Sequence, residues 1–196
     1  MKFDQTTTVL MVMDFMNDIV HPKGKFAPWG IPAHVQKQNA IANTKNLLQK
    51  ARKARIKVIH ITVSYEKGYA SLKNIKTSLH KSLQEAGALL RGEWGAEIYE
   101  ELRPITDEVV LNKTRTNPFT IPELEEELNG KVNVLLAGVA TNFVVEECAR
   151  TAAAKDFNVV VIEDCCASMS QEIHDFPIKN ILPHLTTVMK SKEVDF

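Results

Sequence analysis

The amino-acid sequence predicts a three-layer α/β fold, in which a mostly parallel, six-stranded sheet carries helices on both faces. Short apolar runs alternate along the chain with longer segments of helical period, which is the pattern of α/β proteins. The runs are continuously apolar rather than alternating, as strands buried on both faces should be. At 196 residues, with no repeat and no linker rich in Pro, Gly or Ser, the chain is expected to form one domain over residues 1–196.

Six apolar runs are predicted as strands, and the last of them is the weakest. In chain order they cover residues 8–14, 57–63, 108–113, 132–138, 158–163 and 186–190. In such a sheet, ligands bind at the carboxyl ends of the strands, where the strand order changes direction. Polar residues that end a strand are therefore the first candidates for a functional site.

Two longer segments are predicted as helices that pack against the sheet. Residues 34–54 place apolar side chains, among them Leu47 and Leu48, near one face and Lys and Arg on the other. Residues 142–156 are almost wholly apolar or small after two acids in the early turns, where acids are favourable for the helix dipole. The stretch 65–92 has weaker periodicity and is interpreted as a lid, an edge helix or an oligomer contact that shapes a pocket.

The balanced charge of the chain and the short length of its apolar runs exclude several classes of function. The chain has 24 basic and 24 acidic side chains, so no overall field attracts nucleic acid or an anionic membrane surface. The N-terminus lacks the features of a signal peptide, and no apolar run approaches about 20 residues. We therefore expect a cytoplasmic protein that binds neither nucleic acid nor a membrane.

The three cysteines and six histidines form no recognisable metal motif. Cys165 and Cys166 are adjacent, and no Cys or His spacing suits zinc, which indicates a reducing compartment without a disulfide framework. Cys148 falls in an apolar helical segment, where inert packing is favoured over reactivity. No Gly-rich phosphate loop or dinucleotide-binding fingerprint is present. Neither a metal nor a cofactor is expected.

Asp14 and Lys113 each end a predicted strand. The carboxylate of Asp14 is either a cap for the following segment or a catalytic acid/base whose pKa is tuned by burial. The ammonium of Lys113 is either a solvated strand end or a partner that holds that carboxylate ionised or binds an anionic group. Residues 138–142 (GVATN) join the fourth strand to its helix, where backbone N–H groups would face the same crevice and form an oxyanion site.

Four stretches carry a family resemblance: TVLMVMDFMNDIVHP, RGEWGAEIYEEL, VVLNKTRTNPF and residues 135–168. In this order and spacing they resemble the isochorismatase-like (cysteine) hydrolases, which include nicotinamidases, N-carbamoyl amidohydrolases and isochorismatases. The resemblance implies a Rossmann-like sheet, a catalytic Asp at Asp14 and a catalytic Lys at Lys113. It also implies a cis peptide bond between Val139 and Ala140, which directs the N–H of Ala140 and of the nucleophile residue toward the substrate oxyanion.

The sequence departs from the family pattern at the nucleophile. Amide-cleaving members read T-N-x-C-V-E, whereas residues 141–146 read TNFVVE, so the nucleophile position is Val144. Cys148 lies one helical turn further along, roughly 6 Å down the axis, and does not simply replace the missing thiol. The metal-ligand pattern of nicotinamidases is also missing from residues 62–66.

These observations lead to the hypothesis of a hydrolase of a small, anionic metabolite. Asp14 would act as general acid/base with water, assisted by Lys113 and by an oxyanion site from the backbone of Ala140 and Val144. The isochorismatase branch, which cleaves a vinyl ether with the Asp as acid and lacks the thiol, offers a precedent. The alternatives are an amide hydrolase with a relocated cysteine and a catalytically silent homologue that binds a small molecule or a partner protein.

Two expectations concern the surroundings of this site. The residues that flank the matched motifs near strand ends, and are expected as pocket walls, are Phe15, Trp94, Phe119 and Asn142. The resemblance further implies a homodimer or homotetramer. Whether the bond cleaved is a vinyl ether or an amide stays open at this point.

Overall fold

The computed structural model describes residues 1–196 and contains one six-stranded sheet. Its strands are β1 (Thr8–Met13), β2 (Lys57–Val63), β3 (Val109–Lys113), β4 (Asn133–Val139), β5 (Asn158–Ala167) and β6 (Thr187–Met189). Their order is β3-β2-β1-β4-β5-β6, and every neighbouring pair is parallel. The prediction of an α/β fold with a parallel six-stranded sheet is confirmed.

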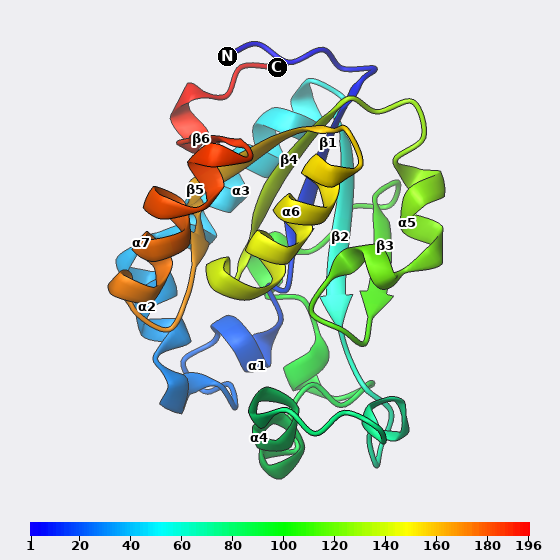
Figure 1. The fold of residues 1–196 in the computed structure, drawn as a ribbon, viewed down its shortest axis with the longest axis vertical. Helices are drawn as coiled ribbons and strands as arrows, with labels where there is room; N and C mark the ends of the chain where they lie inside the picture. Colours follow the sequence, from blue (N-terminus) through cyan, green and yellow to red (C-terminus); the bar gives the residue numbers. More distant parts are fainter.

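The strand order places a switch point between β1 and β4. The chain starts at the middle of the sheet, steps outward to β2 and β3, and returns to β4 on the other side of β1. Connections on the two sides of this point run in opposite directions, which leaves a crevice at the carboxyl ends of the strands. In Figure 1 these ends lie at the bottom, beside α1 and α4, whereas both chain termini lie at the top.

Helices cover both faces of the sheet, as predicted. They are α1 (Asn17–Val20), α2 (Ile31–Lys37), α3 (Ala40–Lys53), α4 (Ser78–Ala86), α5 (Pro122–Glu127), α6 (Glu146–Ala154) and α7 (Gln171–Asn180). In Figure 1, α6 and α7 lie in front of the sheet and α3 lies behind it.

The alternation of side chains along β1 divides the core into two layers. Leu10 and Val12 belong to the cluster that contains Leu48 of α3, whereas Met11 belongs to the cluster that contains Ala149 of α6. Successive strand residues point to opposite faces, so a strand covered on both sides is apolar at every position. All six residues of β1 are buried accordingly.

Several elements differ from the prediction at their ends. The helix expected over 34–54 is interrupted at Asn39, which has a left-handed φ of 54°, a conformation that Asn tolerates better than most residues. The helix expected over 142–156 begins with a π-helical turn over Thr141–Val145. β5 runs to Ala167, past a register shift against β4.

Besides the single-turn helix α1, three helices were not predicted as separate elements. α5 is only six residues long and mostly acidic, and α7 has Pro177 inside it, so neither has the sequence pattern of a regular amphipathic helix. The third, α4, lies within the stretch interpreted as a lid or edge helix and begins with a side-chain cap from Thr77.

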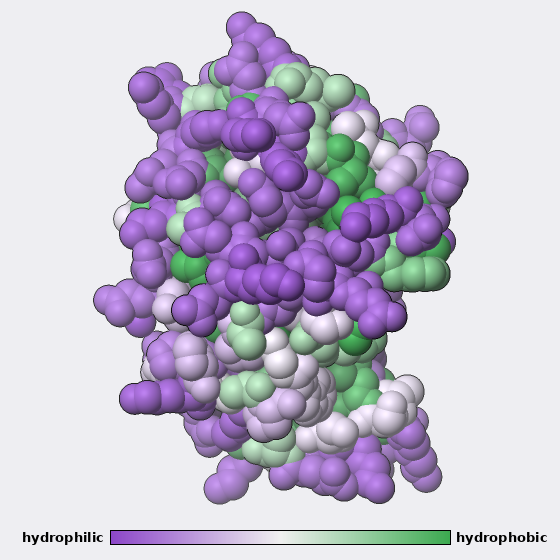
Figure 2. Space-filling view, turned by 90° about the vertical axis from the view of Figure 1, so that its left-hand side faces the viewer, coloured by the Kyte–Doolittle hydropathy of each residue, from purple (hydrophilic) through white to green (hydrophobic).

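The outer surface on the α2 and α7 side is mainly hydrophilic. Figure 2 shows charged and polar residues over most of this face, with smaller apolar areas between them. None of the helices combines the length and the apolar character that a membrane span requires.

Candidate active site

A cavity lies at the carboxyl ends of the central strands and holds about 580 Å³ of space not occupied by protein atoms, part of it at the open mouth. Of its 18 lining residues, 13 are hydrophobic. The polar lining residues are Asp14, His80, Lys113, Arg115 and Thr116. The expectation that polar residues at strand ends meet in one crevice therefore holds for Asp14 and Lys113.

Asp14 and Lys113 form a buried ion pair. Lys113 Nζ donates a hydrogen bond to Asp14 Oδ2 over 2.7 Å, and the two residues are only 3% and 5% exposed. Asp14 directly follows β1 and has a positive φ of 61°, with its N–H donating to the carbonyl of Ile61 in β2. Lys113 is the last residue of β3. The side chain of Lys113 thus reaches past the end of β2 to the end of β1.

The carboxyl of Asp14 has a shifted pKa and one oxygen without a hydrogen-bond partner. Burial raises its pKa above the ordinary value, and the neighbouring Lys113 ammonium offsets only part of that rise. Oδ2 accepts from Lys113, whereas Oδ1 is buried without a hydrogen-bond partner. A proton carried by Asp14 therefore belongs on Oδ1.

The turn after β4 lines the same cavity. The peptide bond between Val139 and Ala140 is cis, as the family resemblance implied. Val139, Ala140, Phe143 and Val144 all contribute to the cavity wall. Val144, at the position expected for the nucleophile, therefore contributes an isopropyl group to the wall. The turn that joins β4 to α6 lies next to the Asp14–Lys113 pair.

A buried chain of hydrogen bonds holds this turn from behind. Thr141 donates through Oγ1 to the carbonyl of Ala167 over 3.0 Å, so its oxygen accepts from His174 Nδ1 at 2.8 Å. The other ring nitrogen of His174 then accepts from the side-chain amide of Gln38, 3.0 Å away. This direction of donation fixes His174 as the neutral Nδ1–H tautomer.

The neutral state of His174 predicts an acid-dependent loss of stability. Burial lowers the pKa of His174 to about 4, below its ordinary value of 6.5. Between about pH 6.5 and pH 4, the imidazole of His174 is therefore protonated in the unfolded chain and neutral in the folded chain. The free energy of unfolding falls as the pH drops through this window. Each pH unit in this window costs up to about 1.4 kcal/mol.

Urea unfolding of the wild type and of His174→Gln at several pH values measures this loss. The difference in unfolding free energy between the two is expected to shrink as the pH falls from 6.5 to 4. His184→Gln removes an exposed histidine and should keep the wild-type pH dependence. Parallel stability curves for the wild type and His174→Gln would contradict the assignment.

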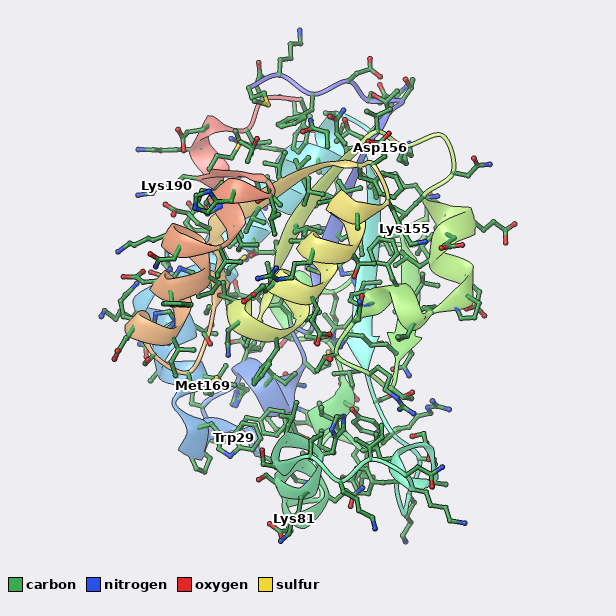
Figure 3. All side chains as sticks on the ribbon, viewed as in Figure 1. Trp29, Lys81, Lys155, Asp156, Met169 and Lys190 are labelled. Atoms are coloured by element: carbon green, nitrogen blue, oxygen red, sulfur yellow. The ribbon has the colours of Figure 1, made fainter.

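The walls of the cavity come from other residues than those expected. Phe26 and Trp29 stack with ring centroids 4.5 Å apart, and both line the cavity together with Tyr65 and Phe143. Figure 3 shows Trp29 on the segment before α2, near α4, whereas Lys81 lies on the outer side of α4. The stretch 65–92, expected to shape the pocket, contributes Tyr65 and residues of α4.

None of the four residues expected as pocket walls lines this cavity. Phe15 is buried in the core behind it, and Trp94 is 48% exposed and packs edge-on against His21. Phe119 packs against the core cluster of α6, and the Asn142 side chain accepts a hydrogen bond from Ser168. Nearness to a motif in sequence does not fix side-chain direction, which depends on the local backbone dihedrals.

Comparison with known proteins identifies the family. The model of the isochorismatase domain matches residues 8–193, nearly the whole chain. The chain belongs to the isochorismatase family. Its members and relatives are hydrolases, so this isochorismatase-family chain is a hydrolase by class.

Individual relatives agree with this assignment. The ureidoacrylate amidohydrolase RutB of Caulobacter segnis is 27% identical over 174 residues, which cover 82% of this chain and 72% of the relative. An isochorismatase family protein of Desulfovibrio vulgaris has a TM-score of 0.80 at 27% identity, over 95% of each chain. N-carbamoylsarcosine amidase of Thermoplasma acidophilum, at 21% identity and a TM-score of 0.74 over 97% of this chain and 99% of its own, shares the fold.

This isochorismatase-family protein has no thiol at the cavity. Cys148, Cys165 and Cys166 are free and fully buried, and none is a lining residue. Burial raises the pKa of all three thiols, that of Cys166 to about 12. Such thiols stay protonated and shielded near neutral pH. No group of three or more His, Cys, Asp or Glu side chains is placed to hold a metal ion.

Three of the five polar lining residues of the isochorismatase-family site, His80, Arg115 and Thr116, were missed in the sequence, and so was the phenol of Tyr65. Arg115 follows Lys113 by two positions, and Tyr65 follows the end of β2 by two. The sequence analysis looked for polar residues that end a strand. This rule identifies Lys113, but it leaves out residues that lie beyond the strand end. Extending it by two residues would have found Arg115 and Tyr65.

Proposed function

We propose that this isochorismatase-family protein hydrolyses a small, anionic metabolite through Asp14 and a water molecule, without a covalent thiol intermediate. The observation that carries the proposal is the buried Asp14–Lys113 pair in an otherwise apolar cavity, beside a wall residue, Val144, that has no nucleophilic atom. Lys113 and an oxyanion site from the backbone of Ala140 and Val144 complete the catalytic group. The expected cytoplasmic location and homo-oligomer belong to this proposal.

Asp14 serves as acid or base according to its protonation. When protonated, it donates the Oδ1 proton to the substrate, and the bond to the leaving group breaks. Water then attacks the resulting cation, and the proton that water loses returns to Asp14. When ionised, Asp14 instead takes a proton from water as the water oxygen attacks a carbonyl carbon, and passes that proton to the leaving atom. The raised pKa of Asp14 favours the first route over a wider pH range.

Lys113 has two functions in this proposal. Its ammonium keeps the carboxylate form of Asp14 accessible in an apolar cavity, where an unpaired charge would be too costly. It also holds Oδ2, which leaves Oδ1 as the atom that exchanges the proton. The charge developing on a substrate oxygen would be met by the backbone N–H groups of the turn at Ala140 and Val144.

A substrate screen tests the proposal. Small ureides, amides and vinyl ethers, each with a carboxylate, are incubated with the wild type and with Asp14→Ala, and products are followed by mass spectrometry. Ureides are included because a relative is named for ureidoacrylate hydrolysis. The proposal expects turnover of one class by the wild type alone. A wild type that binds ligands and forms no product at any pH would support the silent homologue instead.

The missing thiol gives a second test, by alkylation. Val144→Cys places a thiol at the cavity wall, so iodoacetamide is expected to modify one cysteine in the folded variant and none in the folded wild type, as counted by mass spectrometry. The exchange removes one methyl group from the wall and costs about 0.5 to 1.5 kcal/mol, as for other single-methyl deletions. Unfolding should expose three thiols in the wild type and four in the variant.

The same alkylation separates the relocated-cysteine alternative. Wild-type hydrolysis is expected to survive treatment with iodoacetamide, because the three native thiols are buried with raised pKa values. Inactivation of the wild type by iodoacetamide, together with a Cys148→Ala variant that is folded but inactive before any treatment, would instead identify Cys148 as the nucleophile and overturn the thiol-free mechanism.

A further inference from the structure

Arg115 is a cation in the cavity wall without a counter-charge. Its Nη1 donates to the carbonyl and hydroxyl of Thr114, over 2.7 and 3.2 Å, and its Nη2 donates to the carbonyl of Ser71 over 3.0 Å. All three acceptors are neutral, and Arg115 takes part in none of the ion pairs of the protein. Lys113, in contrast, is committed to Asp14.

The hydrogen bonds of Arg115 fix its position without neutralising it. The loop after β3 supplies one set of acceptors, and the segment before α4 supplies the other. The guanidinium is thereby tied to two segments that are distant in sequence. A planar guanidinium held in this way is prepared for two-point contact with a carboxylate.

The neighbours of Arg115 add a hydrogen-bond donor and no second charge. Tyr65 is buried, lines the cavity and uses no protein group as acceptor for its hydroxyl, in contrast to Tyr69, which donates to Ala88. Burial raises the pKa of Tyr65, and the negative charge of Asp14 raises it further, so the phenol keeps its proton. Burial, then the Arg115 charge, lower the pKa of His80, which keeps this imidazole neutral.

Apart from Thr116, the rest of the cavity is apolar. Leu79 and Leu83 of α4 face it from one side, and the stacked pair Phe26 and Trp29 faces it from another. Apart from the indole N–H of Trp29, these side chains carry no hydrogen-bonding group, so they contact a ligand through apolar surface. A ligand that fits must therefore combine an apolar body with one anionic end.

We propose that the cavity binds small monocarboxylates with an apolar body, with the carboxylate on the guanidinium of Arg115 and the hydroxyl of Tyr65. The apolar body lies against Phe26, Trp29 and Leu83. This inference deepens the proposed function and rests on it, since the bond to be cleaved then lies beside Asp14. Arg115, and not Lys113, is the residue that selects the anionic substrate.

Calorimetric binding of three probe carboxylates, benzoate, hexanoate and cyclohexanecarboxylate, tests the inference without requiring turnover. At least one is expected to bind the wild type, more weakly as salt increases, and its neutral amide is expected to bind poorly. Arg115→Met should weaken the carboxylate by roughly 10-fold or more and leave the amide unchanged, because a charged hydrogen bond is lost. Tyr65→Phe should weaken it by less than Arg115→Met.

Two controls keep the outcome decisive. Arg115→Lys keeps the positive charge and should recover part of the affinity, and thermal unfolding checks that each variant is folded. No binding of any probe to the wild type, or equal binding to Arg115→Met, would overturn the inference. If the carboxylates bind through Arg115 while the substrate screen yields no product, the proposed hydrolysis fails and the carboxylate site stands.

Discussion

Replacement of Asp14 by asparagine is expected to reduce hydrolysis by about 10²- to 10⁴-fold, the range that a positioned acid or base contributes. The amide has nearly the shape of the carboxyl, and its oxygen can still accept a hydrogen bond from Lys113. In the wild type Lys113 Nζ lies 2.7 Å from Asp14 Oδ2. The amide cannot donate the Oδ1 proton or take one from water. The loss should therefore appear in kcat, with KM changed much less.

Initial rates on the substrate identified by the screen measure this effect. Asp107→Asn, which changes an exposed acid before β3, serves as the matched control and should keep wild-type rates. Binding of a probe carboxylate to Asp14→Asn shows that the cavity is intact. An Asp14→Asn variant with wild-type kcat would exclude Asp14 as the acid or base.

Replacement of Lys113 by methionine is expected to destabilise the fold by about 3 to 5 kcal/mol at neutral pH, because it leaves the Asp14 carboxylate buried and unpaired. The ammonium is the group that lowers the pKa of Asp14, so its removal raises that pKa further above the unfolded value of 3.8. A carboxyl with a raised folded pKa is stabilised below pH 3.8, and it loses that stability as the pH rises through its folded pKa. The cost of Lys113→Met should therefore be small near pH 4 and grow toward pH 8.

Urea unfolding at pH 4, 6 and 8 measures this dependence. The double variant Asp14→Asn/Lys113→Met has no charge left in the pair, so it should recover most of the stability at pH 8 and lose the pH dependence. An equal cost of Lys113→Met at all three pH values would show that the lysine contributes by packing and not as the partner of a buried charge.

The central part of this site was readable from the sequence because each residue ends a strand. Continuous apolar runs predict strands buried on both faces, and parallel strands place their carboxyl ends at one edge of the sheet. This places Asp14 and Lys113 together although 99 positions separate them in the chain. Gly138 near the end of β4 and the small residues that follow it indicated a turn at the same edge, and the cis bond there agrees with the family resemblance.

The walls of the cavity were not readable in the same way. Phe15 follows Asp14 directly, but the positive φ of Asp14 redirects the chain, and Phe15 is buried in the core. Trp94 and Phe119 flank matched motifs and nevertheless pack elsewhere. Trp29, on the segment before α2, and the side chains of α4 also line the cavity. The positions of these two segments depend on contacts with parts of the chain that are distant in sequence. The hydrophobic periodicity of the sequence contains no information about such long-range contacts.

The sequence by itself determined the parallel six-stranded sheet, the residues at its carboxyl edge and the absence of a thiol at position 144, because burial and strand period are local properties of the chain. The tertiary structure decided the state of those residues. It pairs Lys113 with Asp14, and it leaves Arg115 hydrogen-bonded to neutral acceptors without an ion-pair partner. Charge pairing depends on distances between side chains from different elements, and only the folded chain fixes those distances.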